Sequence, residues 1–143
     1  MTERAPNAPH RTASDMFYIT NESDAANAVM LCYCFCKKLP LNEVTASEIT
    51  TAFSELASNI IKYAGSGHIE LSGVETRLGQ AGVEIIATDK GPGIADIELA
   101  LKDSYSTGKS LGLGLPGVKR LMDEFSIESF AGKGTSITAR RWL

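Results

Sequence analysis

The chain has no apolar stretch that approaches the ~18 residues of a membrane-spanning helix, and its first residues lack the apolar centre of a signal peptide. Basic residues are not in excess, because 17 acidic side chains outnumber 14 lysines and arginines and give a formal net charge of −3. Nucleic acid is therefore a poor partner. These absences predict a cytoplasmic protein that binds neither membrane nor nucleic acid.

Cysteine and histidine are scarce, with three and two copies in 143 residues. The cysteines Cys32, Cys34 and Cys36 lie at alternate positions, and no second cluster or nearby histidine completes a four-ligand zinc site. We therefore expect the three cysteines to be small core residues of a protein in a reducing compartment. A redox or metal role stays open as the alternative.

The remaining composition is typical of a soluble globular protein, with 43% hydrophobic and 22% charged residues. A length of 143 residues predicts a single domain. Residues 1–15 are polar and contain two prolines. We therefore expect a flexible N-terminal tail over 1–15 and one folded domain over 16–143.

Apolar residues recur every three to four positions in the first half of the chain, which predicts two helices. The first covers about 21–38 and follows a short strand at 16–20. The second covers about 42–64, and it begins at residue 42 or at Thr45, where a capping-box pattern (Thr-Ala-Ser-Glu) starts. The apolar stripe of this second helix consists of Ile49, Phe53, Leu56, Ile60 and Tyr63.

The second half of the chain changes to the alternation that is typical of strands. A short helix is expected at 94–102, and Pro116 lies where the first turn of a third main helix accepts proline. The predicted class is α/β (α+β), a two-layer sandwich with a mixed, mostly antiparallel sheet covered on one face by helices. The strands expected here are 68–72, 83–88, 125–130 and 135–142.

Two familiar nucleotide motifs almost match and fail on context. Residues 112–117 have the letters G-x-G-x-x-G, but a polar loop precedes them, whereas a dinucleotide fold needs a strand there. Residues 108–110 (Gly-Lys-Ser) imitate the end of a P-loop, but aspartate occupies position 103, where that motif needs its leading glycine. Neither motif predicts the function.

A different set of residues predicts a nucleotide site. Glu55 and Asn59 are four residues apart, so they share one face of the second helix at the edge of its apolar stripe. The amide oxygen of Asn59 suits a magnesium ion that serves a triphosphate, and Glu55 is able to accept a proton from an incoming hydroxyl. In isolation, such a pair is more often merely solvated.

Two glycine-rich turns accompany that helix. Asp89 directly follows a buried strand, where a carboxylate is able to accept a hydrogen bond from the exocyclic amine of adenine, and Gly91 and Gly93 leave room for the base. A plain Asp-Gly turn is the alternative. Further along, Gly112 and Gly114 lead into a helix N-terminus, which favours phosphate.

A small, polar segment, residues 103–110, precedes these last glycines and is expected to be a mobile lid over the nucleotide. Lys109 within it is placed to reach the terminal phosphate, or else to remain solvated. We therefore expect ATP with Mg²⁺ as the ligand.

These motifs in this order resemble the GHKL (Bergerat-fold) ATP-binding family of gyrase, Hsp90, histidine kinases and MutL. The matching boxes are Glu55 to Asn59, Asp89 to Gly93, Gly112 to Gly114, and Gly134-Thr135. Residues 50–60 and 112–125 look further like the small bacterial anti-sigma and switch serine/threonine protein kinases, above all the stressosome switch kinases. The likeness covers about residues 16–143.

The resemblance implies an ATP-dependent serine/threonine protein kinase. Such kinases phosphorylate small STAS-domain regulators and activate a PP2C-type phosphatase when they are released from these regulators. A homodimer is a further possible assembly. Glu55 would be the catalytic base, Asn59 the magnesium ligand, and Asp89 the adenine-binding residue. The other implied contacts are Gly91, Gly93 and Thr135 with the base, and Gly112 and Gly114 with phosphates.

Two other functions are alternatives to a serine/threonine kinase. A sensor histidine kinase is disfavoured, because the only histidines, His10 and His68, lie in the N-terminal segment and at a strand start. A partner-binding module, such as an anti-sigma factor or phosphatase activator with little kinase activity, remains the alternative. The position of Lys109 and the cysteine cluster depart from the family pattern, which leaves lid contacts and regulation open.

Overall fold

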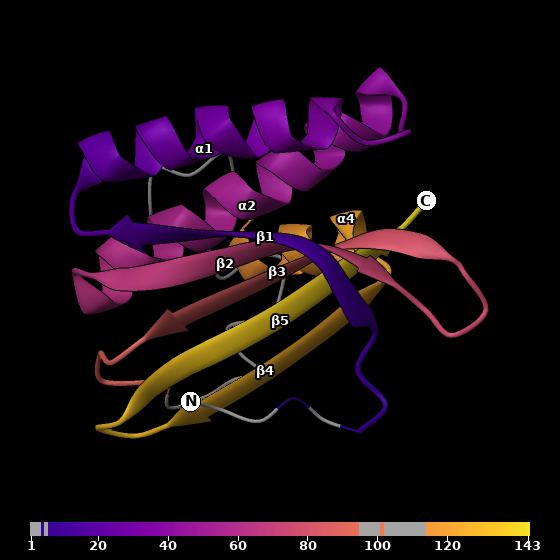
Figure 1. Ribbon diagram of the computed structural model, residues 1–143. Coiled ribbons are helices and arrows are strands. Elements are labelled where there is room, and N and C mark those ends of the chain that lie inside the picture. The colour runs from indigo at the N-terminus through magenta and orange to yellow at the C-terminus, as the bar shows by residue number, and fades with distance from the viewer. Residues whose placement is uncertain (1–3, 5, 95–100, 102–113) are drawn as a thin grey trace.

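The computed structural model describes residues 4, 6–94, 101 and 114–143. Within these residues, five strands form one sheet in the order β1-β2-β3-β5-β4, and three helices lie on one side of it (Figure 1). The predicted two-layer class is confirmed. A mixed sheet was expected, whereas each strand pairing in the described part is antiparallel.

The predicted elements appear close to their expected positions. The expected helix at 94–102 and the expected lid at 103–110 lie outside the described residues, apart from positions 94 and 101. The helices are α1 (Glu22–Lys37), α2 (Glu43–Ala64) and α4 (Gly114–Leu121). The strands are β1 (His10–Ile19), β2 (Gly67–Glu75), β3 (Ala81–Asp89), β4 (Glu124–Phe130) and β5 (Gly134–Trp142).

The N-terminal boundary differs from the prediction. Strand β1 begins at His10, which pairs with Glu75, so residues 10–15 belong to the sheet and not to a flexible tail. This stretch is polar because β1 is an edge strand with few buried positions, and apolar alternation therefore does not reveal it. Cross-strand bonds hold it instead, such as the 2.8 Å contact between the hydroxyls of Ser14 and Ser72.

Asparagine side chains cap both long helices. The Oδ1 atoms of Asn21 and Asn42 accept the backbone N–H groups of Asp24 and Thr45, each at 2.8 Å. Asn21 lies at the predicted start of α1. The capping box that starts at Thr45 was wrong, because Asn42 already satisfies the free N–H groups of the first turn of α2.

The core lies between the sheet and α2. Four of the five predicted stripe residues of α2 are buried there, whereas Tyr63 at the C-terminal end is exposed. No helix in the described part of the chain is both long and apolar enough to cross a membrane. The buried residues of this interface are Ile49, Phe53, Leu56 and Ile60 on α2 and Ile69, Leu71, Val83 and Ile85 on the sheet.

The three cysteines divide between core and surface. Cys32 and Cys36 are buried in the core, as expected, but Cys34 is exposed, and all three are free thiols. A hydrogen bond with Cys36 and burial raise the pKa of the Cys32 thiol. No cluster of metal-binding side chains occurs among the residues that the structure covers.

A buried carboxylate forms ion pairs on the face of the sheet opposite the helices. Glu84 on β3 is 1% exposed, and its carboxylate contacts Arg4 at 2.9 Å, Arg140 at 2.7 Å and Arg11 at 3.7 Å. Burial raises the pKa of Glu84, but hydrogen bonds from Arg4 and Arg140 outweigh it and hold that pKa below the ordinary 4.5. Charge pairing therefore joins three segments here.

Replacing Glu84 by glutamine is expected to lower the free energy of unfolding by roughly 1.5–3 kcal/mol at neutral pH, the value of hydrogen bonds to charged groups. Because the folded-state pKa is depressed, this stability is present above pH 4.5 and is lost as pH falls through the folded-state pKa. Urea unfolding from pH 7 to pH 3 measures it. The gap between wild type and Glu84→Gln should close on acidification, and a constant gap would contradict this assignment.

Candidate nucleotide site

The first part of the site is the side of α2 next to α4. Glu55 is 7% exposed and Asn59 is half-buried one helical turn later. The Oε2 atom of Glu55 accepts the backbone N–H of Gly114, the first residue of α4, at 3.2 Å. The predicted acid and the start of the third helix, 59 residues apart in the chain, are therefore in direct contact.

The surroundings of Glu55 change its acidity. Burial raises the pKa of Glu55, while the hydrogen bond from Gly114 and the charge of Lys62 oppose that rise. A carboxylate with a raised pKa is a stronger base once it is deprotonated. Glu55 is thus a buried carboxylate with a raised pKa that contacts the start of α4.

The second part of the site lies at the end of β3. Asp89 is the last residue of this strand and pairs with Gly67 of β2 on one side and with Thr135 of β5 on the other. Its Oδ1 atom accepts the backbone N–H of Gly91 at 2.9 Å, which folds the chain into the predicted turn. No hydrogen bond joins the other carboxylate oxygen of Asp89 to a residue in the described part of the chain.

The two glycines of this turn are needed by the packing of the protein itself. A Cβ atom at position 91 would lie 2.6 Å from the Cβ atom of Ala64, at the C-terminal end of α2. A Cβ atom at Gly93, where φ is +81°, would lie 2.5 Å from the carbonyl oxygen of Phe130. The turn that follows Asp89 is thus packed between the end of α2 and the end of β4.

A pair of hydroxyl groups, on Ser129 and Thr135, lies next to this turn and was not predicted. The Oγ atom of Ser129 lies 2.8 Å from the Oγ1 atom of Thr135 and accepts the backbone N–H of Ile94 at 2.6 Å. Thr135 was expected in the base pocket and is 8% exposed, whereas sequence reasoning missed Ser129. The alternation of exposed positions along β4 gives the face on which Ser129 lies but not its partners.

Seven of the nine predicted site residues are described, and two of the segments that carry them meet α2 at different points along its length. Gly114 contacts α2 at Glu55, and the turn after Asp89 contacts it at Ala64. These two positions are nine residues apart in α2, which is roughly 13 Å at 1.5 Å per residue. The site is therefore elongated along this helix. Lys109 and Gly112 lie outside the described residues. The described members are Glu55, Asn59, Asp89, Gly91, Gly93 and Thr135, with Gly114 at the border of the described segment.

Replacing Gly93 by alanine is expected to cost about 1–3 kcal/mol of folding free energy, because it adds a backbone clash to an unfavourable φ. Gly132 supplies the control, since its φ is +75° but a Cβ atom there would have nothing within 4 Å. Chemical unfolding of both alanine variants measures the difference. Equal losses in the two variants would show that the contact with Phe130 is unimportant.

The comparisons with known proteins identify the family. Residues 20–141 match the family model described as histidine kinase-like ATPase domain. The chain belongs to this family. Its GHKL resemblance and the expected ATP-binding fold are thereby confirmed.

Individual relatives narrow the class. The serine/threonine-protein kinase RsbT of Bacillus subtilis is 51% identical over 125 residues, which cover 87% of this chain and 93% of that protein. An anti-sigma F factor of Thermoanaerobacter is 29% identical over 126 residues, 86% of each chain. The predicted enzyme class, a serine/threonine protein kinase, is confirmed by this relationship.

A solved structure has the same fold along nearly the whole chain. In the SiaB–SiaC complex from Pseudomonas aeruginosa, one chain superposes with a TM-score of 0.53 at 10% identity. The superposition covers 94% of this chain and 92% of that chain. At this identity, the likeness supports the fold alone.

Proposed function

We propose that this protein is a cytoplasmic kinase that transfers the terminal phosphoryl group of ATP to a serine or threonine of small STAS-domain regulators in a bacterial stress-response (stressosome) pathway. When it is released from them, it activates a PP2C-type phosphatase. The observation that carries the proposal is the buried carboxylate of Glu55, which is fixed against the N-terminus of α4 by Gly114. The 51% identity to RsbT supports the substrate class.

The adenine end of the site is assigned to Asp89. Its free carboxylate oxygen would accept the exocyclic amine of adenine, while the other oxygen keeps the bond to Gly91. Gly91 and Gly93 would border the base, and Thr135 is one strand away from Asp89 in direct register. A fixed acceptor at this point would favour adenine over guanine.

The phosphate end is assigned to the start of α4. Backbone N–H groups at a helix N-terminus favour phosphate, so Gly112 and Gly114 would contact phosphates and Lys109 the terminal one. The N–H of Gly114 is bonded to Glu55 in this structure. A phosphate that takes over this N–H would release Glu55, so nucleotide binding would itself free the base.

The magnesium ion implied by the family fits the oxygen donors of α2. Asn59 would hold it through its amide oxygen, and phosphate and water would supply the other ligands, as is usual for Mg²⁺. Such an ion neutralises charge on the phosphates when it is bound. The protein would then position the acceptor hydroxyl in line, and Glu55 would take its proton.

Transfer of label from γ-labelled ATP to a purified STAS-domain protein tests the proposal. Label on a serine or threonine of that protein is the expected result. Stable binding of the STAS protein in the presence of ATP, without label, would instead favour the partner-binding module, an alternative that the 29% identity to an anti-sigma F factor keeps in view. Light scattering of the same samples would show whether the kinase is a homodimer.

A further inference from the structure

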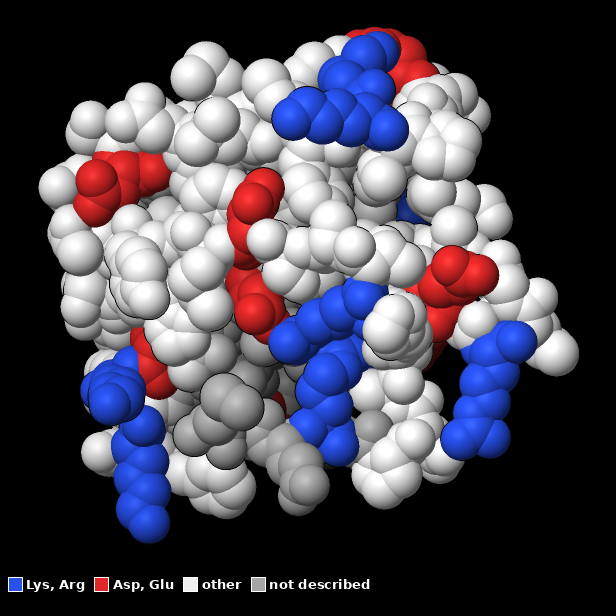
Figure 2. Space-filling model, in the orientation of Figure 1, with Lys and Arg blue, Asp and Glu red and all other residues white. Residues whose placement is uncertain are grey.

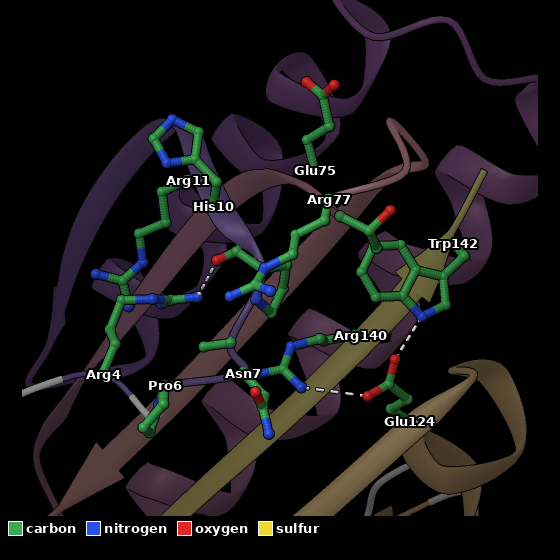
Figure 3. Close-up of a pocket in the computed structure, with 13 residues that line it drawn as sticks. Arg4, Pro6, Asn7, His10, Arg11, Glu75, Arg77, Glu124, Arg140 and Trp142 are labelled. Atoms are coloured by element: carbon green, nitrogen blue, oxygen red, sulfur yellow. Dashed lines mark hydrogen bonds and ion pairs between the residues drawn. The ribbon is translucent and has the colours of Figure 1, made fainter.

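Strand β5 presents alternate residues to the two faces of the sheet. On the face without helices, Arg140 and Trp142 both donate hydrogen bonds to the carboxylate of Glu124 on β4 (Figure 3). Acidic and basic side chains also lie next to one another in Figure 2. These charged groups pair with one another and do not need a ligand.

The helix-covered face differs at the end of the sheet where β3 leads into the nucleotide site. Asp89, Thr135 and Ser129 are direct cross-strand neighbours on β3, β5 and β4, so their side chains form one polar row. Thr135 lies in the middle of this row, next to the residue proposed to bind adenine. The row two residues further into each strand is apolar and consists of Ala87, Ile137 and Ile127.

Ser129 joins two other segments of the site. Its Oγ atom accepts the backbone N–H of Ile94 at 2.6 Å. Its single hydroxyl hydrogen has two acceptors within reach, the Oγ1 atom of Thr135 at 2.8 Å and the carbonyl oxygen of Gly134 at 3.3 Å. A hydroxyl whose oxygen already accepts a hydrogen bond is a stronger donor. The bond from Ile94 and the shorter distance therefore both favour donation from Ser129 to Thr135.

Donation by Ser129 determines what the hydroxyl of Thr135 offers to a ligand. In the described part of the chain, this hydroxyl has no hydrogen-bond partner besides Ser129. When Ser129 donates to it, its own hydrogen is left over, one strand away from Asp89. The exocyclic amine of adenine is flanked by ring nitrogens that carry no hydrogen and accept hydrogen bonds.

We propose that Ser129 is a positioning residue for the adenine base. It orients the hydroxyl of Thr135 as a donor to a ring nitrogen of adenine, while Asp89 accepts the neighbouring amine. The acceptor on β3 and the donor on β5 then match the donor and the acceptor of the base. This inference rests on the proposed ATP site and adds a residue to it.

A double-mutant cycle on ATP affinity tests this role without phosphoryl transfer. Ser129→Ala removes the donor to Thr135, and Thr135→Val removes the hydroxyl but keeps the branched shape. Each single variant is expected to bind ATP about 3–10-fold more weakly, the value of one hydrogen bond. The double variant should bind no more weakly than Thr135→Val, because Ser129 acts through Thr135.

Ser126→Ala is the matched control, since Ser126 is an exposed serine of the same strand, and it should leave ATP affinity unchanged. Melting curves without ATP measure the separate support that Ser129 gives to the backbone of Ile94, which Thr135→Val does not remove. If Ser129→Ala does not fold, Ser129→Cys replaces it in the cycle, because a thiol is only a weak donor.

The double variant distinguishes the two ways in which Ser129 is able to act. Losses that add in the double variant would show that Ser129 acts through Ile94 and would overturn the proposal. So would wild-type ATP affinity in Ser129→Ala. Wild-type protein that binds no ATP would overturn the proposed function as well, whereas ATP binding with additive losses would overturn this inference alone.

Discussion

Replacing Glu55 by glutamine is expected to slow phosphoryl transfer by roughly 10²–10⁴-fold, the usual contribution of a general base. Glutamine has the same shape, and its carbonyl oxygen is able to keep the hydrogen bond from Gly114. It has no basic site for the proton of the acceptor hydroxyl. ATP affinity should therefore change little while turnover falls, the pattern of an interaction that is made only in the transition state.

Single-turnover transfer to a STAS-domain protein, together with a separate titration of ATP, measures the two effects. Glu48→Gln is the matched control, because it makes the same change on the same helix, at a residue that pairs with Arg141 at 3.3 Å. A Glu55→Gln variant that retains more than a tenth of wild-type turnover would remove Glu55 from the role of base.

The pH dependence of turnover is a second test of the role of Glu55. Burial raises the pKa of Glu55, so the base is deprotonated only above the ordinary value of 4.5. Turnover in wild type should therefore fall on acidification at a pH higher than 4.5, and the residual activity of Glu55→Gln should lack that step. The same acid limb in both proteins would assign it to another group.

Replacing Asp89 by asparagine is expected to weaken ATP binding by about 10–100-fold, as the loss of a hydrogen bond to a charged group predicts. The asparagine carbonyl is able to accept the N–H of Gly91, so the turn should persist. Its NH₂ group would then face the amine of adenine, and two donors would meet. The loss should therefore appear in binding and not in folding.

Calorimetric titration of ATP and GTP into both proteins tests this assignment. Wild type should prefer ATP, and Asp89→Asn should lose that preference because the selective acceptor is gone. Asp123→Asn, at an exposed position between α4 and β4, is the control for the charge change. If Asp89→Asn bound ATP with wild-type affinity, the adenine pocket would have to lie elsewhere.

The parts of the fold with local signals were predicted from the sequence. The apolar stripe of α2 follows a simple period, so its buried side was evident, and the strand before Asp89 was evident as a short, mainly apolar run. Glu55 and Asn59 were placed correctly at the border of that stripe because helical spacing alone fixes their relation. The predicted roles of these residues still require the measurements above.

The parts that depend on distant partners were not predicted. The polar strand from His10 is defined by its pairing with β2, and Glu84 is satisfied by Arg4, 80 residues away in the chain. Ser129 acts through Thr135 and Ile94 on other segments. None of these contacts leaves a periodic pattern in the sequence, since each is set by how segments meet in space.

The central claim is that one ATP molecule binds along α2, between the turn after Asp89 and the start of α4. Isothermal titration of wild-type protein with ATP and Mg²⁺ tests it most directly. One ATP is expected per chain, with heat that disappears when GTP replaces ATP. An absence of heat with ATP, in a protein that unfolds cooperatively and is therefore folded, would contradict the account.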